Sequence, residues 1–338
     1  MYPVLLGEGE WALPSYFTML MVGFFVGVAL LRRQAMQAGW DLRKVVDLAL
    51  ILLVAGVAGA RLFHVLFDGY LMDYVHLCTD PLALAQPLPD GTSCTSDAMC
   101  LAAQGQGHDI GAICHDAGPQ GRCVPERDCL RALKFWSGGL TYYGGFLLAL
   151  LAAWWTTRRW RWSLLHFADL AAPSVALGLV FGRLGCFLAG CCFGAPCAGR
   201  CGVTFPVGSD AWRLHRESER EALVAQYQAT GEWSSLPVHP TQLYEAGAML
   251  LVFVGLWFWL RPRRRFHGES LGWLLLSYGV IRFVVEWWRA DMRGALWLFS
   301  TSQWLSLPLV VLGLWLLLRQ GRVAVAPLAS PPSGRQET

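Results

Sequence analysis

The stretch Phe181-Gly182-Arg183-Leu184-Gly185-Cys186 places an arginine inside an apolar segment that covers residues 171–192. A charge near the centre of a bilayer costs about 2.5–3.5 kcal/mol on insertion scales, so this arginine indicates a role that offsets the cost. The flanking glycines let a second helix or a lipid headgroup approach the backbone closely. A second segment of this kind, 278–286, contains Arg282 and Glu286. The alternative is that both arginines reach an interface or pair structurally with carboxylates.

The composition is that of a protein that crosses a membrane several times. Of the 338 residues, 55% are hydrophobic and only 15% are charged, which excludes an ordinary soluble domain. The 17 tryptophans suit a chain with two membrane interfaces, where indole rings concentrate. The net charge is +3. Outside the loops, the sequence has no patch of basic residues interleaved with aromatic ones, which would indicate nucleic-acid binding. We therefore expect contact with membrane lipid and no nucleic acid partner.

Seven apolar runs are each long enough to cross about 30 Å of hydrocarbon. The predicted fold class is an all-α membrane protein with seven transmembrane helices and two long external insertions. The helices are expected at 15–31, 46–67, 138–156, 167–193, 241–260, 270–288 and 302–318. The predicted organisation is helices one and two in 1–68, a Cys-rich insertion in 69–136, helices three and four in 137–193, an external arm in 194–240, helices five to seven in 241–322 and a disordered tail in 323–338.

Short arginine-bearing segments follow the first, third, fifth and seventh runs. They contain Arg32-Arg33, Arg158-Arg159-Trp160-Arg161, Arg261-Pro262-Arg263-Arg264-Arg265, and Arg319 with Arg322. Alternate loops of a multi-pass protein face the same side, and short basic loops face the cytoplasm. The pattern predicts that the N-terminus lies outside and the C-terminus in the cytoplasm.

Six of the 11 cysteines lie in the first external loop, between residues 78 and 129. Their even number in a polar, Gly- and Asp-rich segment indicates a small module held by disulfides, for which fifteen pairings are possible. Disulfides need an oxidising compartment, which agrees with an external position. A metal site is the alternative, but the Cys-x2-Cys spacing typical of zinc sites is absent.

The other five cysteines are Cys186, Cys191, Cys192, Cys197 and Cys201. Vicinal cysteines rarely bond to each other, so we expect Cys191 and Cys192 each to pair with Cys197 or Cys201. Cys186 lies deeper in its helix and is interpreted as a small buried hydrophobic residue. A redox-active thiol in this group, or a zinc site built from its last four members, remains open.

Polar residues in four stretches carry the chemistry. Two of them are the 182–194 segment and the 278–286 segment already described, which continues to Arg289 and Asp291. The third is Ser137-Gly138-Gly139-Leu140-Thr141-Tyr142-Tyr143-Gly144-Gly145, and the fourth is Val238-His239-Pro240-Thr241-Gln242-Leu243-Tyr244-Glu245. Glycines with tyrosines at an interface suit close contact with a headgroup, although small-residue helix packing and an aromatic belt would leave the same pattern.

Together these stretches resemble the prolipoprotein diacylglyceryl transferase family of bacterial inner membranes. The resemblance covers nearly the whole chain except the first-loop insertion and the tail, and Ser302-Gln303-Trp304-Leu305-Ser306 fits it too. It implies a multi-pass enzyme that moves the diacylglyceryl group of phosphatidylglycerol onto the lipobox cysteine of a prolipoprotein signal peptide. A thioether would form and glycerol phosphate would leave. We expect neither a cofactor nor a metal ion to take part.

The resemblance also implies roles for particular residues. Guanidinium groups bind phosphate through paired hydrogen bonds, so Arg183 and Arg282 would hold the lipid phosphate. Glu286 would orient Arg282, and His239 or Tyr143 would help to activate the attacking thiol, whose ordinary pKa is about 8.5. The catalytic candidates are Arg183, Arg282, Glu286, Tyr143 and His239. The substrate-binding candidates are Tyr16, Gly138, Gly139, Gly182, Gly185, Gln242, Tyr244, Glu245, Tyr278 and Arg289.

At three positions the chain departs from the family pattern. Tyr143 stands where the family commonly has histidine, Cys186 where it has asparagine, and Cys191 where it has a glutamate at the membrane edge. A tyrosine, with an ordinary pKa near 10, is a weaker base at pH 7 but a good hydrogen-bond donor. Two alternative functions follow, a membrane thiol oxidoreductase that uses the Cys191–Cys201 cluster and a non-catalytic lipid-binding paralogue.

Overall fold

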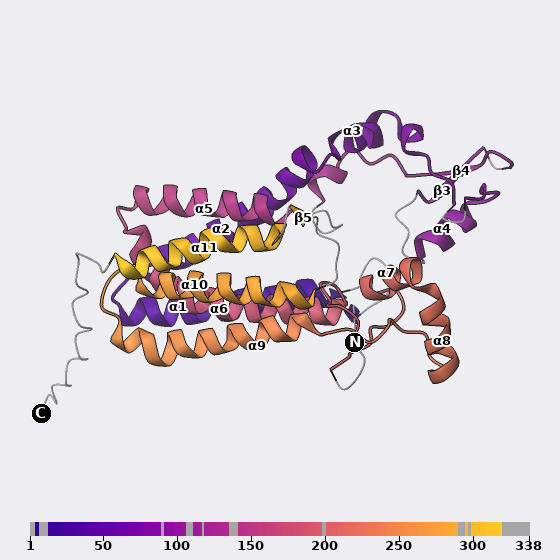
Figure 1. Cartoon of the computed structure of the whole chain (residues 1–338). Coiled ribbons are helices and arrows are strands. Elements are labelled where there is room, and N and C mark those ends of the chain that lie inside the picture. Colours follow the sequence, from indigo (N-terminus) through magenta and orange to yellow (C-terminus); the bar gives the residue numbers. More distant parts are fainter. Residues whose placement is uncertain are drawn as a thin grey trace, which may run out of the picture. The chain divides into compact units, whose positions relative to one another are not determined.

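The computed structural model is mostly helical and divides into two compact units (Figure 1). It describes residues 4–6, 13–88, 91–105, 111–116, 118–134, 141–197, 201–289, 295–296 and 299–319. The first unit consists of Met1–Val46 and Arg161–Thr338, and the second of Asp47–Trp160. The predicted tail at 323–338 and the glycines Gly138 and Gly139 lie outside the described residues.

The first unit is built from five long helices with short elements between them. The long helices are α1 (Ser15–Gln37), α6 (Leu164–Ala189), α9 (Thr241–Val254), α10 (Glu269–Val285) and α11 (Thr301–Leu318). The short elements are β1 (Val4–Leu6), β2 (Leu13–Pro14), α7 (Asp210–Ser218), α8 (Arg220–Thr230), η5 (Gly255–Leu260), η6 (Arg261–Arg263), η7 (Glu286–Trp288), β5 (Ala295–Leu296) and β6 (Phe299–Ser300). The helix α9 continues through the π-helical turns of η5 and the 3₁₀ turn of η6.

Helix α6 occupies the centre of this unit, because it packs against α1, α9 and α10. Its small side chains Ala172 and Ala176 are fully buried, and they pack with Met249 of α9 and Leu274 of α10. Small residues allow helices in lipid to approach closely and gain dispersion contacts. This packing places the arginine of α6 beside the polar residues of α9 and α10.

Helices α10 and α11 approach each other most closely at glycines. A Cβ on Gly313 would lie 2.6 Å from the Leu276 nitrogen, and one on Gly279 would lie 2.8 Å from Cγ2 of Val310. Real Cβ atoms do not approach other heavy atoms so closely, so any larger residue would force the helices apart. The glycines therefore hold α11 against α10, and with it the hydroxyl groups at the start of α11.

The second unit contains two long helices and the disulfide module between them. Its elements are α2 (Leu42–Phe67, which begins in the first unit), α3 (Leu71–Thr79), η2 (Pro81–Leu84), α4 (Asp97–Gly105), β3 (Ile113–His115), β4 (Arg122–Val124), η3 (Arg131–Leu133) and α5 (Tyr142–Arg159). A Cβ on Gly59 of α2 would lie 2.5 Å from the Gly144 carbonyl oxygen of α5. The side chain of Arg61 is 6% exposed, and its Nε donates to the Ala132 carbonyl oxygen at 2.8 Å.

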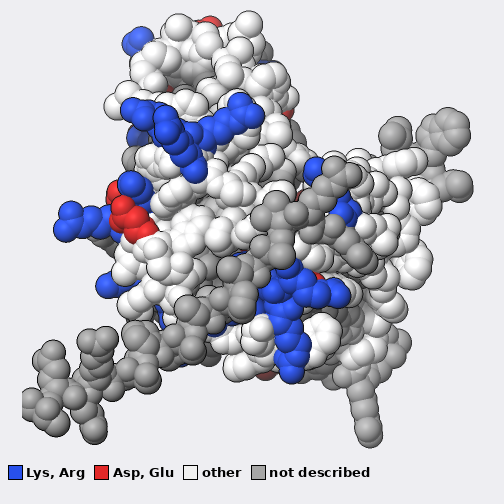
Figure 2. All heavy atoms as spheres, turned by 90° about the vertical axis from the view of Figure 1, so that its left-hand side faces the viewer, with Lys and Arg blue, Asp and Glu red and all other residues white. Residues whose placement is uncertain are grey.

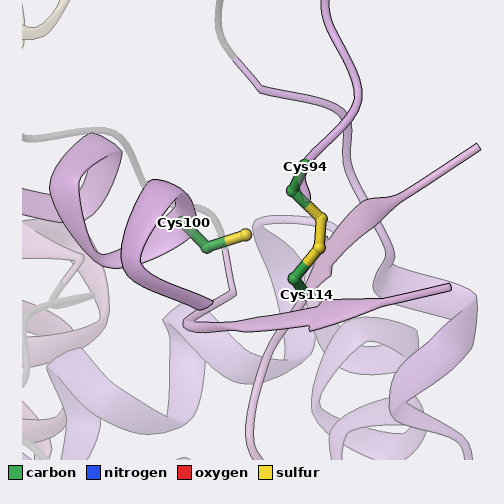
Figure 3. Close-up of side chains that lie close together, drawn as sticks. All are labelled: Cys94, Cys100 and Cys114. Atoms are coloured by element: carbon green, nitrogen blue, oxygen red, sulfur yellow. A yellow bond between two sulfur atoms is a disulfide. The ribbon is translucent and has the colours of Figure 1, made fainter. Parts of the chain in front are cut away.

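All six cysteines of the first loop form disulfides, which confirms the predicted disulfide bonding of this segment. The pairs are Cys78–Cys129, Cys94–Cys114 and Cys100–Cys123. Figure 3 shows the Cys94–Cys114 bond beside the side chain of Cys100. Cys94, Cys100 and Cys123 are fully buried with Leu88 in a small core, over which β3 and β4 pair as an antiparallel hairpin. Among the described residues, cysteines are thus three of the four buried members of this core.

The predicted external arm, 194–240, contains two helices with a core of their own. Ser209 begins α7, because its hydroxyl accepts a hydrogen bond from the Trp212 N–H at 3.2 Å. Phe205 and Val238 are fully buried in this core together with Phe193 and Ala211. The arm is therefore folded, and its core includes Phe193 from the segment just after α6.

Six helices among the described residues are long and apolar enough to cross a membrane. They are Ser15–Gln37, Leu42–Phe67, Leu164–Ala189, Thr241–Arg263, Glu269–Trp288 and Thr301–Leu318. The helix predicted at 138–156 forms as α5 but is not among these six, so the count of seven stays a prediction. The helix predicted at 167–193 ends instead at Ala189, because Gly190 adopts a left-handed conformation (φ 75°) that closes it.

Basic side chains gather on the face of the molecule shown in Figure 2. In the first unit, the chain passes from α9 to α10 on this side (Figure 1), and the connection carries Arg261, Arg263, Arg264 and Arg265. The side chain of Arg265 is 76% exposed, whereas that of Arg264 is 17% exposed and lies 3.9 Å from the buried carboxylate of Asp169. These arginines thus follow the end of one long helix and precede the start of the next, in the segment that the sequence predicts to be cytoplasmic.

Candidate functional site

Glu245 links the two arginines that the sequence places in apolar segments. It lies in the second turn of α9, and its side chain is 3% exposed. Its Oε1 lies 2.7 Å from Nη1 of Arg282 on α10, and its Oε2 forms an ion pair with Nε of Arg183 on α6. One carboxylate therefore joins three helices through two buried ion pairs.

Arg282 has further partners that fix its position. Its Nη2 lies 3.0 Å from Oε2 of Glu286, one turn further along the chain, and also donates to the Ser302 hydroxyl at 2.8 Å. Ser300 in turn donates a hydrogen bond to Oε1 of Glu286 at 2.7 Å. The predicted orientation of Arg282 by Glu286 thus has a direct geometric basis. Because partners surround the guanidinium on several sides, its plane cannot turn freely.

A third arginine completes the cluster. Nη1 of Arg289 lies 4.0 Å from Oε1 of Glu245, and its Nε lies 3.9 Å from Oε2 of Glu286. The Arg289 side chain is only 3% exposed. We call these five side chains the arginine cluster: Arg183, Arg282, Arg289, Glu245 and Glu286. Three guanidinium groups and two carboxylates meet in it.

The segment after α6 is attached to the cluster through its backbone. The N–H of Gly194 donates to the His239 carbonyl oxygen at 2.9 Å, and the N–H of Ala195 donates to the Trp288 carbonyl oxygen at 2.7 Å. A Cβ on Gly194 would lie 2.5 Å from that same Trp288 oxygen, so only glycine fits there. This joins the ends of three helices around the arginine cluster.

Gln242 and Thr241 support the same segment from the first turn of α9. Nε2 of Gln242 donates to the Cys191 carbonyl oxygen at 2.7 Å, and the Thr241 hydroxyl donates to the Cys192 carbonyl oxygen at 2.9 Å. Both side chains are almost completely buried. The amide nitrogen of Gln242 contacts the protein backbone, and its predicted contact with substrate stays a prediction.

His239 and Tyr244 lie at the edge of the site. Nδ1 of His239 is 3.2 Å from the Tyr244 hydroxyl, and Tyr244 is 37% exposed. Glu245, the next residue, is buried, so Tyr244 and Glu245 leave the helix in different directions. The histidine and the tyrosine therefore form a pair at the accessible side, as suits groups that meet an incoming molecule.

Tyr16, Tyr278 and the two glycines of α6 lie near Arg183. Both tyrosine hydroxyls are close enough to interact electrostatically with its guanidinium. A Cβ on Gly185 would lie 3.3 Å from Cα of Tyr16, and one on Gly182 would lie 3.8 Å from Cδ2 of Leu20. Gly185 thus permits the close packing of α1 on α6. From the sequence, either a second helix or a lipid headgroup was expected to approach this glycine.

Tyr143 belongs to the other unit. It lies in the first turn of α5, is 50% exposed, and has its ring 5.9 Å from that of Tyr142. Its proposed part in thiol activation therefore stays a prediction.

The predicted pairing of the second cysteine group is wrong. Cys197 is joined to Cys201, and Cys186, Cys191 and Cys192 are thiols. The left-handed Gly190 (φ 75°) turns the chain at the end of α6 and brings the next two cysteines back over Cys186. Hydrogen bonds from the thiols of Cys186 and Cys191, together with the Arg289 guanidinium, hold the pKa of the Cys192 thiol below its usual range.

Two contributors to the site were given no role in the sequence analysis. They are Ser300 and Ser302, whose hydroxyls contact Glu286 and Arg282. The start of α11 did carry a signal, because Ser300 and Gln303 have the spacing of a capping box, and both of its hydrogen bonds form. That motif predicts a helix start at Ser300 but does not indicate which residues of another helix it meets.

The fold and the site define a multi-pass α-helical membrane protein with a buried cluster of arginines and carboxylates. The chain belongs to the prolipoprotein diacylglyceryl transferase family, whose model matches residues 3–93 and 124–319. It is therefore a bacterial membrane transferase of lipoprotein biosynthesis. The unmatched residues 94–123 fall inside the disulfide module.

Similar proteins support this membership. The chain is 38% identical over 208 residues to a phosphatidylglycerol–prolipoprotein diacylglyceryl transferase of Stenotrophomonas maltophilia, across 60% of this chain and 68% of that protein. A protein of the same name from Xanthomonas oryzae pv. oryzae is 40% identical over 212 residues, with the same two coverages. One from Zymomonas mobilis is 34% identical over 197 residues, across 56% of this chain and 60% of that protein.

Proposed function

We propose that this protein transfers the diacylglyceryl group of phosphatidylglycerol to the thiol of a lipobox cysteine in prolipoprotein signal peptides. The names of the similar proteins support the two substrates. The observation that carries the assignment of the site is the convergence of Arg183 and Arg282 on Glu245 from neighbouring helices. Several guanidinium groups gathered in one buried place favour binding of an anion, above all one with phosphate geometry.

The phosphate of phosphatidylglycerol is an anion of suitable shape for this cluster. A guanidinium group can bind two phosphate oxygens at once, and in a site of low dielectric such hydrogen bonds are strong. Arg183 is the most accessible of the three arginines, with 17% of its side chain exposed, whereas Arg282 is held by three protein partners. We therefore assign first contact with the phosphate to Arg183, and stabilisation of the departing phosphate to the cluster as a whole.

The reaction is a displacement at the carbon of the diacylglyceryl group that is bonded to the phosphate oxygen. The cysteine sulfur forms a bond to that carbon, the carbon–oxygen bond to phosphate breaks, and glycerol phosphate leaves with the bonding electrons. The thiol proton must pass to a base or to water. Charge builds on the leaving phosphate oxygen, and preorganised donors stabilise such a charge most effectively. The arginine cluster would provide them.

His239 is our candidate for receiving the thiol proton. It lies between the arm and α9, half-buried, where its Nδ1 contacts the Tyr244 hydroxyl at 3.2 Å. A neutral imidazole is the usual general base near pH 7.

We further propose that α5 is the seventh transmembrane helix, with the N-terminus outside and the C-terminus in the cytoplasm. The arginines of the last turns of α5, of η6 and of the end of α11, with Arg32 and Arg33 in the C-terminal half of α1, support this orientation. The disulfide module and the arm would then both lie outside, where cysteines are oxidised. Reporter fusions that are active only on one side of the membrane, placed after residues 160 and 240, test it.

A direct turnover assay tests the function. The purified full-length protein is incubated with phosphatidylglycerol vesicles and a lipobox peptide, and the peptide is weighed by mass spectrometry. We expect a gain of one diacylglyceryl group on the cysteine, with glycerol phosphate released in equal amount. Lipid that copurifies without any turnover would instead favour the non-catalytic lipid-binding alternative.

Variants then assign the reaction to the site. We expect Arg183→Ala and Arg282→Ala to lose at least 100-fold in turnover, while Arg319→Ala, beyond the end of α11, stays active. Undiminished turnover in both cluster variants would contradict the assignment. A Cys191→Ser, Cys192→Ser double variant that keeps its turnover would exclude the oxidoreductase alternative.

A further inference from the structure

Three thiols meet beside the arginine cluster. The sulfur atoms of Cys186, Cys191 and Cys192 all lie within 4.8 Å of one another, and we call them the three-thiol cluster. Cys186 is buried in the last turns of α6, and the other two are partly exposed just beyond its end. The cluster is therefore reachable from the accessible side of the site. No step of the proposed transfer reaction uses these sulfur atoms.

The backbone holds the three-thiol cluster in place without any ligand. Gly190 and Cys192 both have left-handed backbone conformations, with φ of 75° and 61°. For a non-glycine residue that conformation is unfavourable, and it persists where surrounding contacts impose it. The Cys191 N–H donates to the Cys186 carbonyl oxygen at 3.1 Å. Buried side chains of α9 hold the carbonyl oxygens of the two vicinal cysteines, as described above.

The oxidation pattern separates this cluster from the other cysteines. Eight of the 11 cysteines form four disulfides, and the three-thiol cluster contains all the rest. The other sets of cysteines that lie close enough to share an ion contain Cys94 with Cys114 or Cys197 with Cys201. Those sulfur atoms are used in disulfide bonds. Among the described residues, only the three-thiol cluster therefore offers three thiolates to one ion.

We propose that Cys186, Cys191 and Cys192 bind a single copper(I) ion in a trigonal thiolate site. Thiolates select soft ions, chiefly copper(I) and zinc. Zinc takes four ligands in structural sites, and the described residues add no histidine or carboxylate to this group of three. A monovalent ion with three sulfur ligands needs no fourth.

The charges around the site also favour a monovalent ion. Arg289 hydrogen-bonds the Cys192 sulfur, and the charge of Arg183 acts on Cys186 and Cys192. These cations oppose a second positive charge on the ion, while Arg289 stabilises a thiolate at Cys192. On binding, three sulfur–hydrogen bonds are replaced by three sulfur–copper bonds, and three protons leave to solvent. The complex then carries a charge of −2, and Arg183 and Arg289 are the cations that act on its sulfur atoms.

The ion would share Arg289 with the arginine cluster. If the proposed function holds, an occupied copper site therefore weakens the attraction for the lipid phosphate. That consequence rests on the proposed function, whereas copper binding does not. The test below measures binding without turnover, so that failure of either proposal can be recognised separately.

Competition with a chelator tests the copper site. The full-length protein in detergent, under anaerobic conditions with ascorbate, is titrated into copper(I) bound to bicinchoninate, and loss of the coloured chelate is followed. We expect one copper(I) ion per chain. The Cys191→Ser, Cys192→Ser double variant should bind at least tenfold more weakly. The matched Cys197→Ser, Cys201→Ser variant, which removes the neighbouring disulfide, should bind as the unmodified protein does.

Alkylation of the unmodified protein gives a second readout that does not depend on how a variant folds. We expect copper(I) to protect Cys186, Cys191 and Cys192, and no other cysteine, from iodoacetamide, as seen by peptide mass spectrometry. The proposal is overturned if copper stays on the chelator, or if the double variant binds as tightly as the unmodified protein. It is also overturned if zinc(II) occupies the same sulfurs more tightly, or if two of the three cysteines prove to be joined in a disulfide.

Discussion

Glu245 of α9 and Arg282 of α10 form an ion pair of 2.7 Å, with 3% and 7% of their side chains exposed. They are 37 residues apart in the sequence, and only the packing of α9 on α10 brings them together. Burial of two charges is costly unless each is fully paired and hydrogen-bonded. Here the guanidinium has two carboxylates and a hydroxyl as partners, so it is held in place before any substrate arrives.

Replacement of Glu245 by glutamine should destabilise the protein strongly. The change leaves Arg183 and Arg282 buried without their shared counterion, and removal of one partner of a buried pair costs about 3–5 kcal/mol. We expect a clearly lower thermal unfolding midpoint in detergent, together with loss of turnover. The control is Glu221→Gln on the exposed surface of α8. Equal midpoints for the two variants would contradict a structural role for the pair.

Replacement of Arg282 by lysine should reduce turnover although the charge is kept. A lysine ammonium cannot reproduce the planar fork that contacts Glu245, Glu286 and Ser302 together. We expect kcat/KM to fall at least 100-fold, which corresponds to about 2.7 kcal/mol of transition-state stabilisation. Arg265→Lys, an exposed arginine that pairs with Glu269, is the matched control and should remain active. Full activity of the Arg282→Lys enzyme would show that only the positive charge of Arg282 matters and that its paired hydrogen bonds do not.

Part of this site could be predicted from the sequence. Arg282 and Glu286 are four residues apart, which on a helix places both side chains on one face, and the ion pair forms. The six loop cysteines also formed three disulfides, as their number and context indicated. Both inferences depend on local spacing or on counting, and neither requires knowledge of which helices are neighbours.

The remaining part depends on tertiary packing. Glu245 was only one candidate among several, because nothing in its own helix shows that Arg183 and Arg282 converge on it. The pairing of Cys197 with Cys201 was missed for a similar reason. The helix was expected to continue to residue 193, but Gly190 ends α6 at Ala189 and turns Cys191 and Cys192 toward Cys186.

Tyr143 gives a test of the departure from the family pattern. If its hydroxyl assists the transfer, Tyr143→Phe should lower kcat at least tenfold, since general acid–base groups contribute about 10²–10⁴ in rate. Tyr143→His should restore or exceed the original rate at pH 7, with a dependence on pH near the ordinary histidine pKa of about 6.5. Steady-state kinetics from pH 5.5 to 8.5 would decide. Equal kcat for the phenylalanine variant and the original enzyme would remove Tyr143 from the mechanism.

The arm should loosen in acid because of His215. Its side chain is 3% exposed, its Nδ1 accepts a hydrogen bond from the Leu236 N–H at 3.2 Å, and burial lowers its pKa. The folded arm therefore favours the neutral ring. The stability from this histidine is complete above the unfolded pKa of about 6.5 and is lost as the pH falls toward the lower folded value.

Hydrogen exchange measures this effect directly. After correction for the intrinsic rate, we expect the amides of α7 and the Leu236 N–H to lose protection between pH 7 and pH 5. In His215→Gln the side-chain amide can accept the same hydrogen bond but does not titrate, so protection should not change over this range. A pH dependence that persists in the glutamine variant would assign it to another group.

The disulfides of the first-loop module should be reduced in a defined order. Thiol–disulfide exchange requires a thiolate to reach a sulfur atom, so access controls the rate. Cys94, Cys100 and Cys123 are completely buried, whereas Cys129 is exposed and Cys78 is partly so. Dithiothreitol at low concentration, quenched at intervals with an alkylating reagent, should therefore label Cys78 and Cys129 first. In denaturant, where every sulfur is accessible, the three pairs should react at similar rates. Simultaneous labelling of all six cysteines in the native protein would mean that the module opens as a whole, and that its small sulfur-rich core does not protect the inner pairs.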